Sequence, residues 1–235
     1  MKVKAKLKVL AFPDLHCPFQ HRDAFDFLDA VNRKQKPDVI IGLGDEADQH
    51  ALSQHTHDPD GMSAGDELTA TVKSIQPLYQ LFPNVKVCTS NHGARPFRRA
   101  MEFGIPRAYL RDYKDFMQAP KGWEWKDRWI IDGVSFQHGE GVSGAEGALK
   151  LATANMMPTV IGHLHGDAGI RFWANSAALL WGLNSGWLGD QHAYAMAYGK
   201  HGLKKGILGC SIINRGMPFF LPMILDKRGR WTGAL

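Results

Sequence analysis

With 235 residues, 44% of them hydrophobic and 22% charged, the chain has the composition of one globular domain spanning residues 1–235, not of a disordered or fibrous protein. The 28 Lys and Arg against 23 Asp and Glu give a net charge of +5, which suits a phosphate-bearing partner, although ordinary solvated charge explains it equally well. The three widely spaced cysteines argue against a disulfide framework, and no apolar run approaches the roughly 20 residues of a membrane span, so we expect a cytoplasmic protein with no membrane contact.

The first part of the chain alternates apolar strand segments with amphipathic helices. Residues 3–12 predict a strand, residues 24–33 a helix and residues 39–43 a second strand, and a helix over 66–82 and a strand over 85–89 repeat the pattern. The apolar runs are continuous, which is typical of strands that are covered on both faces. This βαβ rhythm predicts an α/β fold with parallel or mixed sheets.

Residues 49–66 interrupt this pattern with a polar stretch rich in Asp, Gly and His. The stretch is too long for a tight connection, so we expect a loop that covers a site as a lid. It carries His50, His55 and His57, for which both solvated loop positions and contact with a substrate remain open.

The densest basic cluster in the chain opens the next predicted helix, with Arg95, Arg98 and Arg99. An arginine at this place could bind a phosphate through two hydrogen bonds, and solvated helix charge is the alternative for each. Arg95 is nearest in the sequence to His92, and we therefore name it as the candidate substrate-binding residue.

The second part of the chain predicts shorter elements. An Asp-Gly pair at residues 132 and 133 supplies the positive φ angles of a tight turn, so residues 123–131 and 134–137 read as a hairpin. A helix over 143–156 and a strand over 159–161 follow. Beyond residue 168 we expect antiparallel strands that close a second sheet over residues 168–235. These strands are expected at 168–173, 206–213 and 219–225.

Five of the predicted strands are followed at once by residue types that bind metal ions, which would place the ligands along one sheet edge. The set comprises Asp14, His16, Asp45, Asp48, Asn91, His92, His138, His163 and His165. Oxygen and nitrogen ligands without a thiolate suit Mn, Fe, Zn or a similar ion, and the set is too large for one four-ligand site. We therefore expect two divalent ions bridged by one carboxylate.

Two such ions about 3.5–4 Å apart can hold a hydroxide between them and clamp two phosphoryl oxygens, which is the chemistry of phosphoester hydrolysis. The leaving alkoxide needs a proton. A histidine that is not used as a ligand should supply it, and a nearby carboxylate would keep that histidine protonated.

The ordered series Asp-x-His, Gly-Asp-x-x-Asp, Asn-His, His and Gly-His-x-His spans residues 14–165 and resembles the calcineurin-like metallophosphoesterase superfamily. The resemblance implies a four-layer α/β/β/α sandwich of two mixed β-sheets flanked by helices. It also implies two divalent metal ions, Mn²⁺ first and Fe, Zn, Ni or Mg as alternatives. The implied residues are Asp14, His16 and His165 on the first metal, Asp45 as the bridge, Asn91, His138 and His163 on the second, and His92 as the proton donor, oriented by Asp48.

The chain departs from the family pattern at three positions. Ser90 stands where the family usually has Gly, and Gly93 where it has an acidic residue. Glu46 stands where the protein phosphatases of the family carry Arg, which argues against that branch, whereas His165 is typical of the nuclease and phosphodiesterase branches.

We therefore expect a metal-dependent phosphodiesterase that acts on DNA, RNA or a nucleotide. One alternative is a phosphomonoesterase acting on a small phosphate ester or a phosphoprotein. The other is a module that binds nucleic acid or a protein partner and uses its metal centre structurally. The sequence predicts no oligomeric state.

Overall fold

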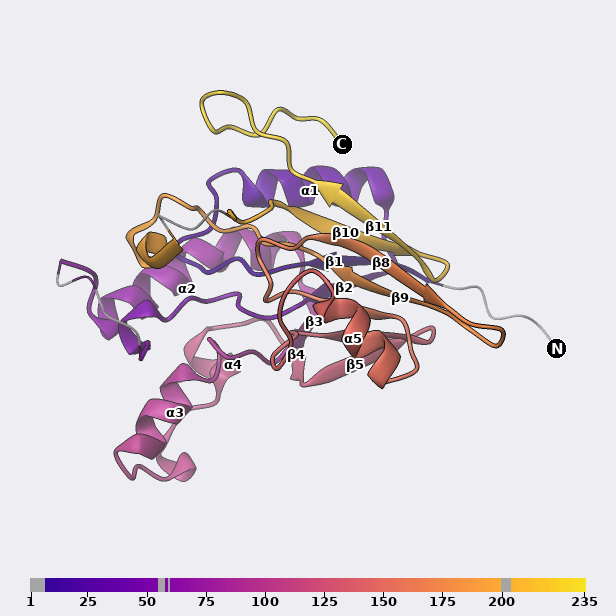
Figure 1. Ribbon diagram of the computed structural model, residues 1–235. Coiled ribbons are helices and arrows are strands. Elements are labelled where there is room, and N and C mark those ends of the chain that lie inside the picture. Colours follow the sequence, from indigo (N-terminus) through magenta and orange to yellow (C-terminus); the bar gives the residue numbers. More distant parts are fainter. Residues whose placement is uncertain (1–6, 55–57, 59, 200–203) are drawn as a thin grey trace.

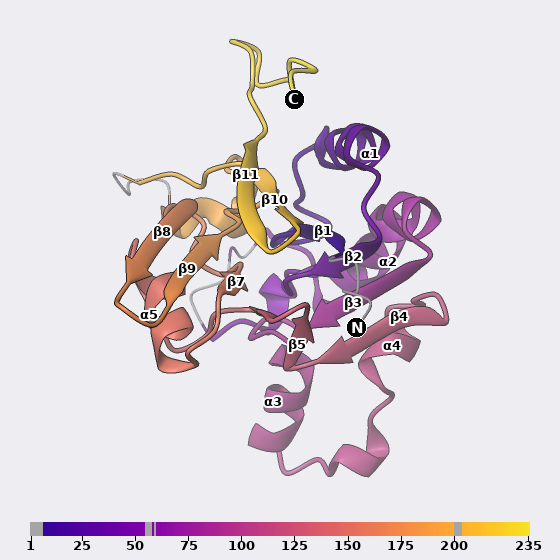
Figure 2. The ribbon, with the colours of Figure 1, turned by 90° about the vertical axis from the view of Figure 1, so that its right-hand side faces the viewer.

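The computed structural model describes residues 7–54, 58, 60–199 and 204–235 (Figure 1). Two mixed β-sheets of six and five strands lie face to face, with helices on both outer faces (Figure 2). The predicted four-layer α/β/β/α sandwich is confirmed.

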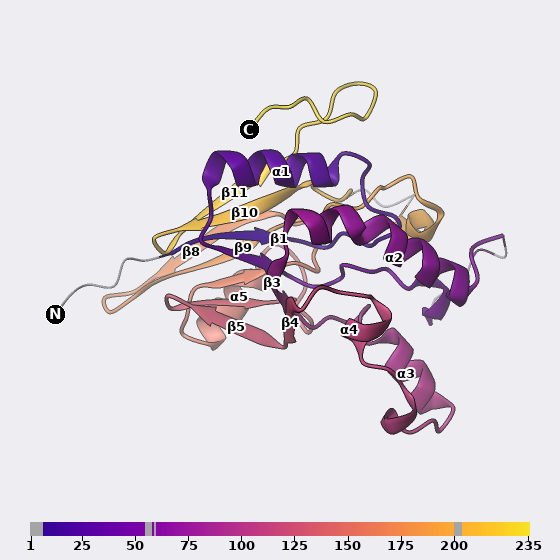
Figure 3. The same cartoon turned by 180° about the vertical axis from the view of Figure 1, so that it is seen from behind.

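The first sheet contains the strands of the N-terminal βαβ units, and its strand order is β11-β10-β1-β2-β3-β4. Strands β1 to β4 run parallel, while β10 pairs antiparallel with both β1 and β11. Helices α1 and α2 cover the outer face of this sheet (Figure 3). The bounds are β1 Lys8–Phe12, α1 Ala24–Gln35, β2 Val39–Gly42, α2 Ala64–Leu81, β3 Asn84–Cys88, β4 Gly122–Lys126, β10 Gly209–Asn214 and β11 Met217–Pro222.

The second sheet has the order β5-β6-β7-β9-β8. Strands β6, β7 and β9 are parallel, and β5 and β8 close the two edges in antiparallel pairing. Helix α5 packs on the outer face, mainly against β9. The bounds are β5 Arg128–Ile131, β6 Val134–Gln137, α5 Gly147–Ala154, β7 Thr159–Ile161, β8 Gly169–Ala174 and β9 Leu179–Asn184.

Strand β1 shows why its sequence is apolar without alternation. Leu10 and Phe12 pack in the core under the helices, whereas Val9 and Ala11 pack in the core between the two sheets. Successive side chains of a strand point to opposite faces, so a strand in the middle layers must be apolar at every position. The expectation of strands covered on both faces is confirmed here.

The predicted hairpin is confirmed at its turn, where Asp132 and Gly133 have φ angles of 49° and 78°. Its first strand is not continuous, however. Residues 122–126 form β4 in the first sheet, and the chain then crosses to the second sheet and forms β5. The crossing lets Trp123 pack under the helices and Trp129 pack between the sheets.

The expectation that residues 168–235 all join the second sheet is wrong for the last two strands. Only β8 and β9 do so, and β9 was not assigned from the sequence. Strand β10 lies beside β1 because both its faces are apolar, with Ile212 in the core under the helices and Ile213 between the sheets.

The remaining elements are short and lie near one end of the sheets. In the expected lid, residues 50–52 form a 3₁₀ turn and residues 64–66 already belong to α2, while His55 and His57 lie outside the described residues. No helix in the described ranges is both long and apolar enough to cross a membrane. The short elements are η1 His50–Leu52, α3 Arg95–Glu102, η2 Arg107–Tyr109, α4 Tyr113–Phe116 and η3 Tyr194–Gly199.

An ion pair between the half-exposed Arg230 and the buried Asp23 fastens the C-terminal segment to the start of α1. The Arg230 guanidinium donates to both carboxylate oxygens of Asp23, with Nε 3.0 and 2.9 Å away and Nη2 2.6 Å from Oδ1. The Trp231 amide donates to the same carboxylate, and the Trp231 ring packs edge-on against Phe27. The hydrogen bond from Arg230 lowers the pKa of Asp23 to about 2.

We predict that Asp23→Asn lowers the melting temperature at pH 7 by about 3 °C, since the variant loses charge-assisted hydrogen bonds worth about 1 kcal/mol. A depressed carboxyl pKa stabilises the fold above the ordinary value of 3.8 and loses that effect as the pH falls toward 2. The difference in the free energy of unfolding between wild type and variant, measured with urea, should therefore decrease between pH 4 and pH 2. Asp29→Asn, which breaks an exposed pair with Arg33, is the control and should change little. A gap that does not depend on pH would contradict this account.

Candidate metal centre

The predicted metal-ligand residues lie together, but they come from two sheets. Those of the 14–16, 45–48 and 91–92 segments follow β1, β2 and β3 of the first sheet, whereas His138 and the 163–165 segment follow β6 and β7 of the second. The expectation of one sheet edge is therefore wrong. The carboxyl ends of parallel strands in both sheets open to the same side of the sandwich, and their turns meet there.

A first group consists of Asp14, His16 and His165, whose ligand atoms all lie within 4.8 Å of one another. His165 Nε2 is 3.0 Å from Asp14 Oδ2 and 3.1 Å from His16 Nε2. Asp14 and His16 are almost completely buried, and His165 is partly exposed.

A second group consists of Asp45, His138 and His163. His138 Nε2 is 3.3 Å from Asp45 Oδ2 and 3.2 Å from His163 Nδ1. The Asn91 side-chain oxygen reaches the same nitrogen at 2.8 Å. The four side chains thus direct their ligand atoms at one small volume.

Asp45 lies between the two groups. Its Oδ2 is 4.0 Å from His16 Nε2 of the first group and 3.3 Å from His138 Nε2 of the second. Asp45 has a left-handed backbone with φ 48°, as have His16 at 53° and His163 at 64°. Non-glycine residues hold this conformation at a cost of about 1–3 kcal/mol, and such positions cluster at functional sites.

The donor set fits divalent metal ions. Carboxylate oxygens and neutral imidazole nitrogens present lone pairs. Here several such acceptor atoms face one another at hydrogen-bond distance, with fewer N–H donors than acceptors between them. Asp14 Oδ1 is buried and has no hydrogen-bond partner among the described residues. Buried unpaired acceptors are costly, and a cation held among them removes that cost.

The pKa shifts favour the same interpretation. Burial lowers the pKa of His16 and of His163, which keeps both imidazoles neutral and able to bind a metal. Burial opposes ionisation of Asp45, yet the neighbouring His138 and His92 outweigh it and hold its pKa well below the ordinary value. The same pairing with Asp45 raises the pKa of His138 to about 10 against the effect of burial, so a metal bound there would displace a proton.

His92 forms a third such group with His16 and Asp45, and it is also connected to Asp48 and Arg95. His92 Nδ1 lies 2.7 Å from the Asp48 carbonyl oxygen and 3.4 Å from Asp48 Oδ1, and His92 Nε2 lies 3.8 Å from Asp45 Oδ2. Arg95 donates to the Asp48 carbonyl at 2.8 Å and to Asp48 Oδ1 at 3.1 Å, and its Nη2 lies 3.0 Å from His92 Nε2. Arg95 therefore contacts both residues of the predicted proton-donor pair.

The other two arginines of the cluster contact backbone carbonyls, Arg99 in the loop after β2 and Arg98 in the turn after β3. Arg99 donates to the carbonyls of Leu52 and Ser53, and Arg98 donates to the Asn91 carbonyl at 2.8 Å. These guanidinium groups hold backbone turns in place.

The departures from the family pattern have structural reasons. The Ser90 hydroxyl accepts hydrogen bonds from the Asp45 amide at 3.0 Å and from the Gly93 amide at 3.3 Å, and so ties two ligand turns together. Glu46 is buried, and its carboxylate accepts a hydrogen bond from the Trp125 indole at 2.9 Å. It therefore faces the protein interior and cannot act as a phosphate-binding residue.

Two supporting residues were missed in the sequence. Trp187 stacks on the His165 ring with centroids 4.8 Å apart and planes 16° apart. Asn184 donates to the Leu164 carbonyl at 2.7 Å and accepts from the Gly186 amide, which fixes the turn between His163 and His165. Asn184 is the last residue of the unassigned strand β9 and Trp187 follows that strand, so the sequence analysis had no place for them.

The chain matches no protein-family model and no curated protein. Among solved structures it resembles YfcE, a phosphoesterase from E. coli, at 10% identity and a TM-score of 0.47, over 96% of each chain. It also resembles Vps29 from Chaetomium thermophilum, at 11% identity and a TM-score of 0.46 over 96% of this chain and 93% of that one. A metallophosphoesterase from Sphaerobacter thermophilus follows, at 15% identity and a TM-score of 0.45 over 93% and 88%.

With identities of 15% or less and TM-scores below 0.5, these comparisons say nothing about its substrate. Its chemistry has to be argued from its own side chains.

The close approach of Gly162 to Asp14 gives a test of the metal centre that removes no ligand. A Cβ atom at Gly162 would lie 2.2 Å from Asp14 Oδ1, so Gly162→Ala must displace the carboxylate. We predict that this variant binds Mn²⁺ at least about tenfold more weakly in equilibrium dialysis, as expected when a ligand is moved from its place. Gly65→Ala is the control, since its Cβ would meet no atom nearer than 4.0 Å. Equal metal affinity of the two variants would show that Asp14 is not a ligand.

Proposed function

We propose that this protein is a phosphoester hydrolase that uses two divalent metal ions, Mn²⁺ first, and cleaves phosphodiester bonds. One observation carries the proposal. Carboxylate, amide and imidazole groups from five strand ends converge around Asp45, which lies close both to His16 on one side and to His138 on the other. Asp14, His16 and His165 would hold one ion, Asn91, His138 and His163 the other, and Asp45 would contact both.

When bound, two such ions supply Lewis-acid polarisation of the phosphoryl oxygens and activation of water at neutral pH. The chain itself supplies the proton for the leaving group, and His92 is placed for that role. Burial lowers the pKa of His92, but the charges of Asp45 and Asp48 outweigh it and raise that pKa above the ordinary 6.5. The direction of this shift favours the protonated imidazole that a general acid requires.

Arg95 fits the role of a substrate-binding residue that also holds Asp48. Its guanidinium lies 3.0 Å from His92 Nε2, the nitrogen that would deliver the proton. A phosphate oxygen reaching His92 would therefore come within range of the guanidinium, which favours planar, bidentate contacts with phosphate.

The surface beside His165 favours a phosphodiester over a small phosphate monoester. A hollow of about 530 Å³ is lined by His165, Trp187, Lys204 and Lys205. A second hollow of about 480 Å³ shares the Trp187 wall and continues past it. Its cationic lining residues are Arg22, Lys227 and Arg228.

Five cations thus border a path that leads away from the metal centre. Among the described lining residues, Asp167 and Asp190 are the acidic ones, and Asp167 pairs with Lys204 at 2.6 Å. A monoester needs no such path, whereas a nucleic-acid strand presents one phosphate after another to it. We infer that the substrate is a single strand of DNA or RNA that lies along this path.

The proton-donor role predicts a specific loss in His92→Ala. Its hydrolysis of bis-p-nitrophenyl phosphate with Mn²⁺ should fall about 10²- to 10⁴-fold, while its Mn²⁺ content stays that of the wild type. His192→Ala, at an exposed histidine of the path, is the control and should keep most activity on this small substrate. Full activity of His92→Ala would refute the assigned role.

The path predicts a substrate-dependent effect of charge reversal. The double variant Lys227→Glu/Arg228→Glu should cut single-stranded oligonucleotides about tenfold or more slowly at low salt, with hydrolysis of bis-p-nitrophenyl phosphate unchanged. Lys73→Glu/Lys150→Glu is the matched control, because it changes the net charge by the same amount at positions away from the path. Equal losses of oligonucleotide cleavage in both double variants would show that the net charge of the protein, not the path, is responsible.

The two alternative functions predict other results. Faster hydrolysis of p-nitrophenyl phosphate than of the diester would favour a phosphomonoesterase. Oligonucleotide binding without turnover would favour the binding module.

A further inference from the structure

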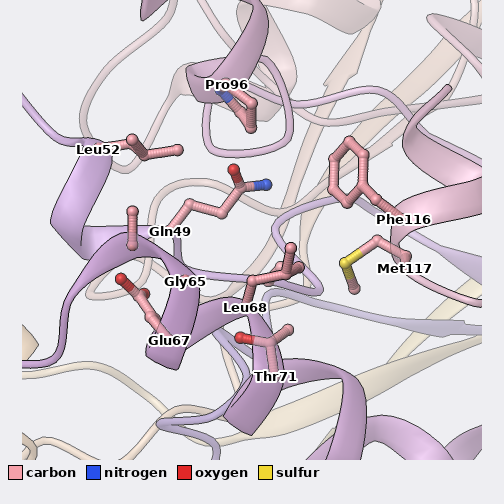
Figure 4. Close-up of a pocket in the computed structure, with 11 residues that line it drawn as sticks. Gln49, Leu52, Gly65, Glu67, Leu68, Thr71, Pro96, Phe116 and Met117 are labelled. Carbon is pink, nitrogen blue, oxygen red and sulfur yellow. The ribbon is translucent and has the colours of Figure 1, made fainter. Parts of the chain in front are cut away.

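A further cavity, distinct from the two hollows beside His165, lies next to the 47–52 segment, among η1, α2, α3 and α4 (Figure 4). Its volume is about 330 Å³, which lies in the range of small-molecule sites. Its walls are mainly apolar, and none of its lining residues belongs to the metal-ligand set. The apolar lining includes Leu52, Leu68, Pro96, Phe116 and Met117.

Gln49 brings a polar group into this apolar space. The residue is 8% exposed, and its Nε2 is buried without a hydrogen-bond partner. In Figure 4 its amide extends between Leu52, Pro96 and Phe116. The backbone of Gln49 is left-handed, with φ 57°, and its carbonyl accepts from Arg95 at 3.3 Å.

The other polar side chains of the lining already have partners. The Glu67 carboxylate accepts from the amides of His50 at 2.6 Å and Ala51 at 2.7 Å. The Thr71 hydroxyl donates to the Cys17 carbonyl at 3.1 Å. The Gln49 amide is thus the polar lining group, within the described residues, that has a donor left to offer.

An amide donor buried without a partner costs about 1–3 kcal/mol, so such groups call for an explanation. A water molecule needs two to four polar partners, and these apolar walls provide few. A molecule that is apolar over most of its surface and carries one acceptor would satisfy both the walls and the amide.

We propose that this cavity is a binding site for a small neutral molecule, mainly apolar or aromatic, whose single carbonyl oxygen accepts a hydrogen bond from Gln49 Nε2. The site is separate from the metal centre. It is nevertheless joined to it, because Gln49 follows Asp48 and Pro96 follows Arg95 in the chain. A ligand here would contact both residues that flank the Arg95–Asp48 pair, and binding at the two sites would be reciprocally coupled.

Two probes of almost equal shape separate the contribution of the carbonyl from that of the apolar walls. Acetophenone carries the acceptor, and ethylbenzene replaces it with a methylene group. Binding is followed by NMR through the methyl group of Met117, which lines the cavity and is completely buried, with Met117→Leu identifying the signal. We expect both probes to shift this signal in a saturable way.

Three variants complete the test. Gln49→Met keeps the length of the side chain without the donor. It should lower the affinity for acetophenone about tenfold and change the affinity for ethylbenzene by less than about twofold. Leu68→Trp, at a partly exposed lining position, should fill the cavity and abolish the shift of the Met117 signal with both probes. Lys73→Trp on the same helix should leave both shifts intact. A Met117 signal that neither probe shifts in the wild type, or equal weakening of both probes by Gln49→Met, would overturn the proposal.

Discussion

The structure depends on the burial of Asp45 at the point where two sheets end. Its carboxylate is 2% exposed and faces His16 and His92 from the first sheet and His138 from the second. A buried carboxylate persists only if positive charge or donors surround it. The turns after β1, β2, β3, β6 and β7 are arranged to provide these, and the left-handed backbone at His16, Asp45 and His163 is part of that arrangement.

Two layers of contacts hold these turns. Asp14 joins the sheets, because its carboxylate accepts from the His163 amide at 2.7 Å while its own strand belongs to the first sheet. Ser90 joins the turns after β2 and β3. Farther out, the guanidinium groups of Arg95 and Arg99 hold the 48–53 segment by its carbonyls. This segment separates the metal centre from the apolar cavity, so a shift in it would be felt at both.

Local sequence patterns predicted the elements that are set by local rules. Continuous apolar runs located β1, β2 and β3, and the Asp132-Gly133 pair located a turn whose φ angles are both positive. The candidate metal-ligand residues were selected because each follows such a run.

What the sequence did not reveal depends on pairing between distant segments. Nothing in residues 122–131 indicates that the chain changes sheets at Asp127, and nothing local places β10 beside β1, 200 residues earlier in the chain. The partners of Arg95 were equally hidden, since Asp48 lies 47 residues away. The contact of Trp187 with His165 was hidden as well, because it is made only when β9 lies beside β7.

The central claim, that Asp45 joins two metal sites, is tested most directly by the electron paramagnetic resonance spectrum of the protein titrated with Mn²⁺. The account predicts an exchange-coupled signal that grows until two ions are bound per chain, because neighbouring ions that share a ligand are magnetically coupled. Saturation with one ion per chain, and a spectrum of isolated Mn²⁺ throughout, would contradict it.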